Sequence, residues 1–193
     1  MLRTARRLAG AAALGLAILA SPPVAHAQVT ASMETGQLLA NDGLRPGQYR
    51  WHPDQAAAEG PLRIVVSLPL QRAWVFRGET LAGVATVSTG QPGYDTPTGT
   101  FPILQKRVDH RSNLYDNAPM PFMQRLTWDG IALHGGPIPR SGEPASHGCI
   151  RLPQAFARQL YRITELGTVV VVTDQAPGAP EEALAFAAAP ATG

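Results

Sequence analysis

The sequence contains very little cysteine: a single residue, Cys149, in a chain of 193. One cysteine cannot form a disulfide within the chain, which excludes the small disulfide-stabilised domains common among secreted proteins. Charged residues are also scarce, at 16%, and this excludes the highly charged proteins that remain disordered. Hydrophobic residues make up 45% of the chain, enough to build the packed core of one domain of ordinary size.

Long apolar runs are missing except at the N-terminus. Leu8–Ala20 carries no charge, follows three arginines and precedes an A-x-A cleavage pattern at residues 25–27. The run is shorter than the roughly 20 residues of a membrane span. We therefore expect residues 1–27 to be a signal peptide that is removed, with an uncleaved anchor as the alternative. The signal predicts export to the periplasm and no membrane span in the mature protein.

An excess of basic residues is absent once the signal is set aside. Three of the 16 lysines and arginines lie in residues 1–27, which leaves 13 basic residues against 14 acidic ones. The sequence shows no basic patch of the kind that nucleic-acid binding requires. We expect no nucleic-acid partner.

Glycine and proline are plentiful, with 19 and 18 residues, and favour short strands joined by turns over a helical bundle. Apolar patterns predict strands at 62–68, 72–76, 80–89, 100–108, 123–128, 130–135 and 168–173. Apolar residues three or four apart predict one helix between Pro153 and Gly167. The fold class is therefore mainly β, a sandwich or barrel with motif loops at its rim.

The same pattern divides the chain into four parts. A polar, turn-rich lead-in segment, 28–60, follows the signal. One folded domain is expected over 61–173. The Ala- and Pro-rich segment 174–193 is expected to be a mobile tail.

The cysteine lies in the stretch SHGCIR, residues 146–151. A lone cysteine in an exported protein is either buried and inert or kept reactive. A free thiol has a pKa of about 8.5, so a reactive cysteine at neutral pH needs a base to take its proton. His147 lies two residues before Cys149, and His134 ends the predicted strand 130–135. Either histidine is a candidate general base.

Other groups nearby suit the same chemistry. The amides of Gly148 and Cys149 could bind an oxyanion, which is worth about 3 kcal/mol per donor. Arg151 could hold either a thiolate or a substrate carboxylate, and the N-terminus of the predicted helix would favour a thiolate if it points at the site. Two alternatives stay open on the residues alone. One is a buried cysteine without chemistry, and the other is a zinc site formed by His134, His147 and Cys149.

These residues, in this order, resemble the catalytic domain of the L,D-transpeptidases, the YkuD-type family. The matching blocks are QRAWVFRG at 71–78, STG at 88–90, TPTGTF at 96–101, HG at 134–135 and SHGCIR at 146–151. The resemblance covers about residues 61–173. It implies a β-sandwich of mixed sheets with one short helix after the cysteine loop. It also implies an enzyme that needs no cofactor or metal and acts on peptidoglycan stem peptides.

The resemblance assigns roles by position. Cys149 is implied as the nucleophile and His134 as the general base, with the carbonyl of Gly135 orienting the other ring nitrogen. The amides at His147, Gly148 and Cys149 are implied as the oxyanion hole.

Three further residues complete the implied site. Arg151 is expected to steady the site or the substrate, Ser146 to brace the loop, and Tyr94 with the loop 109–119 to line the groove. The spacer GGPIPRSGEPAS, 135–146, carries three prolines and predicts a small, stiff lid.

The implied reaction begins with attack of the cysteine on the L-centre carbonyl of the third residue of a stem tetrapeptide. D-Ala leaves, and an amine resolves the thioester. The amine comes from a second stem, giving a 3–3 cross-link, from a D-amino acid, or from a protein such as an outer-membrane lipoprotein. The alternatives are an L,D-carboxypeptidase or thiol amidase, in which water resolves the thioester, and a non-catalytic wall-binding domain.

Overall fold

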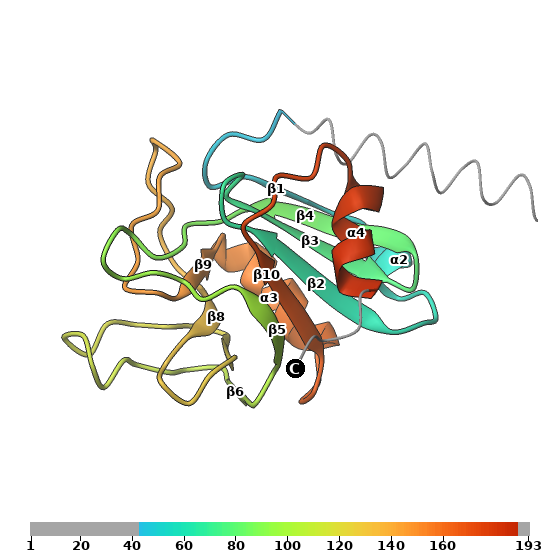
Figure 1. Cartoon of the computed structure of the whole chain (residues 1–193). Coiled ribbons are helices and arrows are strands. Elements are labelled where there is room, and N and C mark those ends of the chain that lie inside the picture. The colour runs from blue at the N-terminus through green and yellow to red at the C-terminus, as the bar shows by residue number, and fades with distance from the viewer. Residues whose placement is uncertain (1–42, 189–193) are drawn as a thin grey trace, which may run out of the picture.

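The structure, a computed structural model, describes residues 43–188 (Figure 1). The expected signal peptide, 1–27, lies outside the described residues, as do the first part of the lead-in segment and residues 189–193. The elements are β1 (Tyr49–Trp51), α2 (Pro53–Ala56), β2 (Leu62–Ser67), β3 (Arg72–Arg77), β4 (Thr80–Thr86), β5 (Gly99–Pro102), β6 (Gln105–Arg107), β7 (Met123–Arg125), β8 (Ala132–Gly135), β9 (Ile150–Leu152), α3 (Gln154–Ile163), β10 (Val169–Thr173) and α4 (Pro180–Ala188). No helix within residues 43–188 is both long and apolar enough to cross a membrane.

The strands form two mixed sheets, which confirms the prediction of a mainly β fold. Sheet A has the strand order β1-β4-β3-β2-β10-β5, and sheet B has the order β6-β7-β8-β9. The β2–β10 and β8–β9 pairs are parallel, and the other pairs are antiparallel. The parallel β8–β9 pair places the segment that follows the cysteine beside the strand that contains His134.

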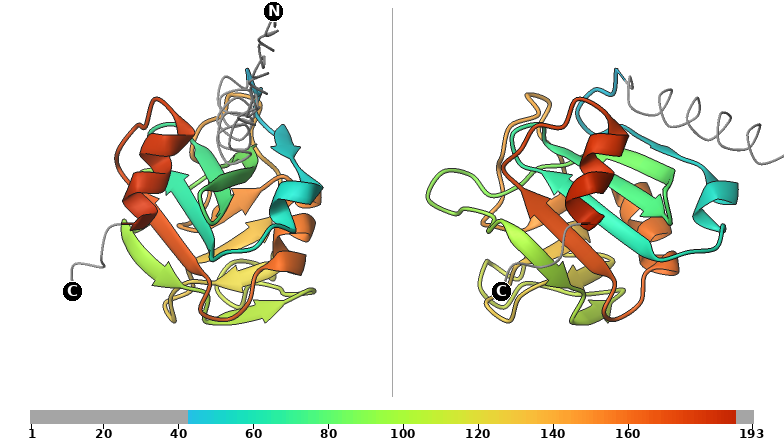
Figure 2. Two further views of the ribbon diagram at one scale, coloured as in Figure 1. Left: turned by 90° about the vertical axis from the view of Figure 1, so that its right-hand side faces the viewer. Right: turned by 45° about the vertical axis from the view of Figure 1, so that its right-hand side comes forward.

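Side chains of sheet A alternate between two apolar layers, as the two-residue period of a strand requires. Ile64 and Val66 of β2 belong to the inner core, while Val65 between them belongs to a second cluster on the opposite face. The inner core also contains Phe156 and Leu160 of α3. Figure 2 shows α3 and α4 on opposite faces of sheet A.

Helix α4 covers the outer face of sheet A and includes part of the segment expected to be a mobile tail. Ala183 is fully buried, and Leu184 and Phe186 pack against the cluster that contains Trp74. Burial of these apolar side chains offsets the entropy lost when the segment is ordered. The Ala- and Pro-rich composition of this segment predicts mobility. The surface that orders it is the outer face of sheet A, which local composition cannot reveal because its residues are distant in the sequence.

The strand predicted at 100–108 is instead two strands in different sheets. β5 pairs with β10 in sheet A, and β6 pairs with β7 in sheet B. Between them the amide of Ile103 donates to the carbonyl of Thr168, and the amide of Leu104 donates to the carbonyl of Arg125. Ile103 is 1% exposed and lies in the inner core. A single straight strand was therefore the wrong prediction, because the chain crosses between the sheets at this buried residue.

The lead-in segment adds a strand to the domain. β1 pairs antiparallel with β4 at the edge of sheet A. Tyr49 and Trp51 of this strand both contact the ring of Phe156 in α3, with ring centroids 5.6 and 5.4 Å away. Residues 49–51 are thus an integral part of the fold.

Candidate active site

The site forms where β8 and β9 lie side by side. Leu133 pairs with Ile150, and both point into the inner core. His134 pairs with Arg151 one position further along, so these two side chains point to the opposite side. Cys149 precedes Ile150 and points to the same side as Arg151. From strand spacing and rise, the Cα atoms of Cys149 and His134 are about 8 Å apart.

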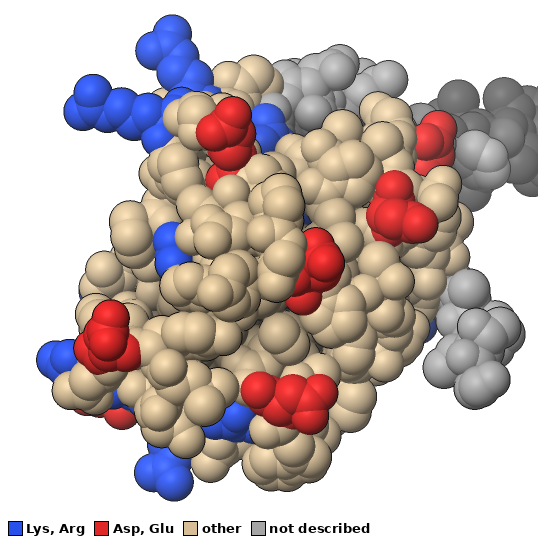
Figure 3. Space-filling model, turned by 60° about the vertical axis from the view of Figure 1, so that its left-hand side comes forward, with Lys and Arg blue, Asp and Glu red and all other residues tan. Residues whose placement is uncertain are grey.

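One cavity of about 270 Å³ opens on this side of sheet B. Cys149, His134 and Arg151 line it from the strands, and residues of the loop 109–119 line it from the other side. The spacer expected to form the lid contributes few lining residues, among them Pro137. The loop 109–119 therefore contributes more of the cavity wall than the spacer does. Figure 3 shows the side of the molecule that carries these loops, where charged side chains are scattered over a mostly uncharged surface.

The thiol of Cys149 is partly buried and protonated at rest. Its Sγ donates to the carbonyl of Gly130 at 3.4 Å. Burial raises the pKa of the thiol, and the amide of Ala132 and the charges of Arg151 and Arg125 offset only part of that effect. The thiolate expected from the sequence is therefore not the resting state, because desolvation outweighs the nearby positive charges.

His134 is neutral and held in one tautomer. Its Nδ1 lies 2.9 Å from the carbonyl oxygen of Gly135, and since a carbonyl only accepts, Nδ1 must carry the proton. Nε2 is then the unprotonated nitrogen. The pKa of His134 is lowered to about 4. Burial is the largest cause, the hydrogen bond to Gly135 raises the pKa in part, and the charges of Arg151 and His110 add to the lowering. At neutral pH the ring is ready to accept a proton.

Ser146 braces the cysteine loop from within. This residue is 1% exposed, and its Oγ donates to the carbonyl of Cys149 at 2.5 Å while it accepts the amide of Gly148 at 3.1 Å. The amide of Gly148 is therefore occupied. The amides of His147 and Cys149 donate to no group within residues 43–188, so two of the three amides expected in the oxyanion hole are available.

Gly148 needs to be glycine. Its φ is +99°, which L side chains rarely adopt, and a Cβ there would lie 2.7 Å from Cδ1 of Ile131. The sharp turn at this position presents the cysteine that follows it to the cavity.

A buried glutamine supports the cysteine loop from a distance, and the sequence analysis did not identify it. Gln71 has φ of +48° and is 8% exposed. Its side chain donates to Oγ1 of Thr89 at 2.7 Å and accepts the amide of Thr89 at 2.9 Å. The carbonyl of Thr89 in turn accepts the amide of Ser146. No local pattern marks this glutamine, because its partners are 18 residues away.

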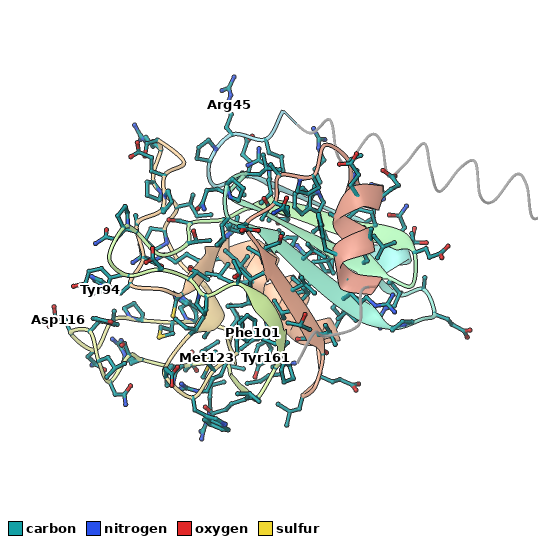
Figure 4. All side chains as sticks on the ribbon, viewed as in Figure 1. Arg45, Tyr94, Phe101, Asp116, Met123 and Tyr161 are labelled. Atoms are coloured by element: carbon teal, nitrogen blue, oxygen red, sulfur yellow. The ribbon has the colours of Figure 1, made fainter. Side chains whose placement is uncertain are left out.

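His147 joins two loops at the mouth of the cavity. Its exposed imidazole is stacked on the ring of Tyr115 in the loop 109–119, with centroids 4.4 Å apart and planes at 16°. The ring of Tyr94 meets it edge-on, also at 4.4 Å. Figure 4 shows Tyr94 and Asp116, which follows Tyr115, at the same end of the molecule. Tyr94 contacts the lining residue His147 and is not itself among those that line the cavity.

The structure thus brings Cys149, His134, Arg151, Ser146 and His147 around one cavity. It does not arrange them as a metal site. Within residues 43–188, no group of three His, Cys, Asp or Glu side chains is placed to hold a metal ion.

Fold and site together define a β-sandwich domain in which a cysteine and a neutral histidine share a cavity. The L,D-transpeptidase catalytic domain family, YkuD, matches residues 61–172, more than half of the chain. The chain belongs to this family.

Known proteins agree with this assignment. The chain is 31% identical over 124 residues to "Probable L,D-transpeptidase 3" of Mycobacterium tuberculosis, a match that covers 55% of this chain and 44% of that protein. The chain therefore spans less than half the length of this curated relative.

Solved structures of the family are also similar. A crystal structure of an L,D-transpeptidase from Stackebrandtia nassauensis has a TM-score of 0.55 at 29% identity, covering 63% of this chain and 59% of that one. The L,D-transpeptidase LdtMt1, solved in complex with imipenem, has a TM-score of 0.52 at 25% identity and covers 58% of each chain.

Proposed function

We propose that the protein is an exported peptidoglycan L,D-transpeptidase in which Cys149 is the nucleophile. The observation that carries this proposal is one cavity shared by the thiol of Cys149 and a neutral His134 whose Nε2 is free to accept a proton. The family of the domain supports the choice of substrate.

The first half-reaction forms a thioester. The thiol rotates from its bond to Gly130, the sulfur bonds to the L-centre carbonyl carbon of the third stem residue, and the thiol proton passes to Nε2 of His134. The carbonyl π electrons move to the oxygen and give a tetrahedral oxyanion. When this collapses, the carbon–nitrogen bond to D-Ala breaks, and the leaving nitrogen takes the proton from His134.

The second half-reaction transfers the acyl group. A neutral acceptor amine bonds to the thioester carbonyl carbon and gives a proton to His134. The carbon–sulfur bond then breaks, and the sulfur of Cys149 recovers that proton. A neutral base suits both halves, because each begins with removal of a proton from the attacking atom.

The charge of the cavity fits the substrate. Arg125 and Arg151 line it, and the lining residues within the described part of the chain include no aspartate or glutamate. Stem peptides carry several carboxylates, which arginine binds well. A cluster of cations without acidic side chains therefore favours an anionic peptide over a cationic one.

The second candidate is hydrolysis of the same thioester, as in an L,D-carboxypeptidase or thiol amidase. Leu114, Tyr115 and Met120 are apolar or aromatic residues of the cavity wall. An apolar wall limits access of water to the acyl carbon and favours an amine that binds in the cavity. We therefore prefer transfer.

The proposal predicts the products of a muropeptide assay. Incubation with a disaccharide tetrapeptide and D-methionine should yield a tetrapeptide in which D-Ala is replaced by D-methionine, together with a 3–3 cross-linked dimer. Mass spectrometry distinguishes both from the tripeptide that a hydrolase would release. Tripeptide alone supports the second candidate, and unchanged substrate would contradict both.

The pH dependence follows from the pKa of His134, which lies at about 4. Since the base form is required, the second-order rate of acylation by imipenem should stay constant from neutral pH down to about pH 5. It should then fall about tenfold per unit below pH 4. Stopped-flow absorbance of the carbapenem measures the rate. A midpoint near the ordinary histidine pKa of about 6.5 would contradict the neutral, buried base.

A further inference from the structure

We propose that Thr96 is a positioning residue that aims the backbone amide of Cys149 at the oxyanion formed during acyl transfer. The inference rests on the proposed function and adds a residue that does not line the cavity. Thr96 is 5% exposed, and its partners belong to the STG and SHGC segments.

Two hydrogen bonds fix the direction of the Thr96 hydroxyl. Its Oγ1 accepts the amide of Gly90 at 2.9 Å and lies 2.8 Å from the carbonyl oxygen of Gly148. An amide only donates and a carbonyl only accepts, so the single hydroxyl proton must point to Gly148. The hydroxyl of Thr96 therefore donates to the carbonyl of Gly148 and fixes the orientation of that carbonyl.

That carbonyl shares a peptide unit with the amide of Cys149. The unit is planar and trans, so its C=O and N–H point in opposite directions. When Thr96 holds the carbonyl of Gly148 on the buried side, the amide of Cys149 must point away from that side. This amide has no acceptor within residues 43–188, as expected of a donor kept free for a ligand.

The threonine is itself held in place. Pro97 follows it and restricts its backbone to extended conformations. Gly90 allows the close approach, because a Cβ there would lie 1.9 Å from the carbonyl oxygen of Tyr94 and 2.8 Å from the amide nitrogen of Thr96. The STG and TPTG segments thus fit together and present one hydroxyl to the cysteine loop.

Thr96 should therefore affect the rate of acylation although it does not contact the substrate. Removing one oxyanion donor typically costs about 10²–10³-fold in rate. Thr96→Val leaves the amide of Cys149 present but without its constraint. We therefore expect acylation to fall by less, about 10–100-fold.

Two reactions of the Cys149 sulfur distinguish a loss of oxyanion stabilisation from a general disturbance of the site. In acylation by imipenem the sulfur adds to the β-lactam carbonyl carbon, an oxyanion forms, and its collapse breaks the carbon–nitrogen bond of the ring, whose nitrogen takes the proton. Alkylation by iodoacetamide displaces iodide from a saturated carbon, forms a carbon–sulfur bond and involves no oxyanion. The test measures both rate constants by mass spectrometry for the wild type, Thr96→Val and Thr96→Ser. Thr98 is an exposed residue of the same loop, and Thr98→Val is the matched control. Thermal unfolding checks that each variant is folded.

The expected result is a 10–100-fold slower acylation in Thr96→Val with alkylation within about twofold of wild type, and recovery in Thr96→Ser, which keeps the hydroxyl. Equal effects on both reactions, or unchanged acylation in a folded variant, would overturn the inference. If Thr96→Val does not fold, Thr96→Ala removes the same hydroxyl without placing a methyl against the carbonyl and is judged by the same two rates. A wild-type protein that imipenem does not acylate would instead contradict the proposed function.

Discussion

The Cys149→Ala variant should show no transpeptidation and no imipenem adduct. In the proposed mechanism the sulfur is the atom that bonds to the substrate carbonyl, and no second cysteine exists in the sequence to replace it. Loss of a nucleophile in an enzyme of comparable chemistry lowers kcat on the order of 10⁶-fold, which is below detection in a muropeptide assay. Mass spectrometry of the intact protein and of its products measures both losses.

Folding should survive this substitution. The thiol lies in a small cluster with Met120, Met123 and Ala132, and its hydrogen bond to Gly130 is long. Alanine keeps the Cβ, so we expect a loss of about 1 kcal/mol or less in the free energy of unfolding. Continued exchange of D-amino acids by a folded Cys149→Ala protein would refute the proposed role of the cysteine.

The second large effect is expected from His134→Asn. An asparagine amide can still donate to the carbonyl of Gly135, as Nδ1 does now, but it cannot accept the thiol proton. General base catalysis contributes about 10²–10⁴-fold, so the rate of acylation by imipenem should fall by that amount. The acid limb of the pH profile should disappear with it.

The matched control is His52→Asn. His52 is exposed and precedes α2, outside the cavity, so this change should leave acylation within about twofold of wild type. If His134→Asn reacted as fast as His52→Asn, another group would have to be the base. The exposed His147 would then be tested next.

Much of the sandwich follows from local pattern. The alternation in β2 and β3 reflects two apolar layers, and the change to helical spacing after Pro153 correctly placed α3. These predictions succeed because each depends on residues that are close in sequence. The strand predicted at 100–108 failed for the opposite reason. Ile103 satisfies the pattern of one strand, yet its amide bonds to Thr168, 65 residues away, and the chain changes sheet there.

The site divides in the same way. The sequence by itself determined the chemical groups: one thiol, the histidines near it, and a glycine that permits the turn at Gly148. Only the tertiary structure decided their state. Burial keeps His134 neutral and Cys149 a thiol, and the bonds to Gly148 from Ser146 and Thr96 orient the amides of the cysteine loop. Desolvation and hydrogen-bond direction depend on atoms supplied by distant segments, so no local pattern can encode them.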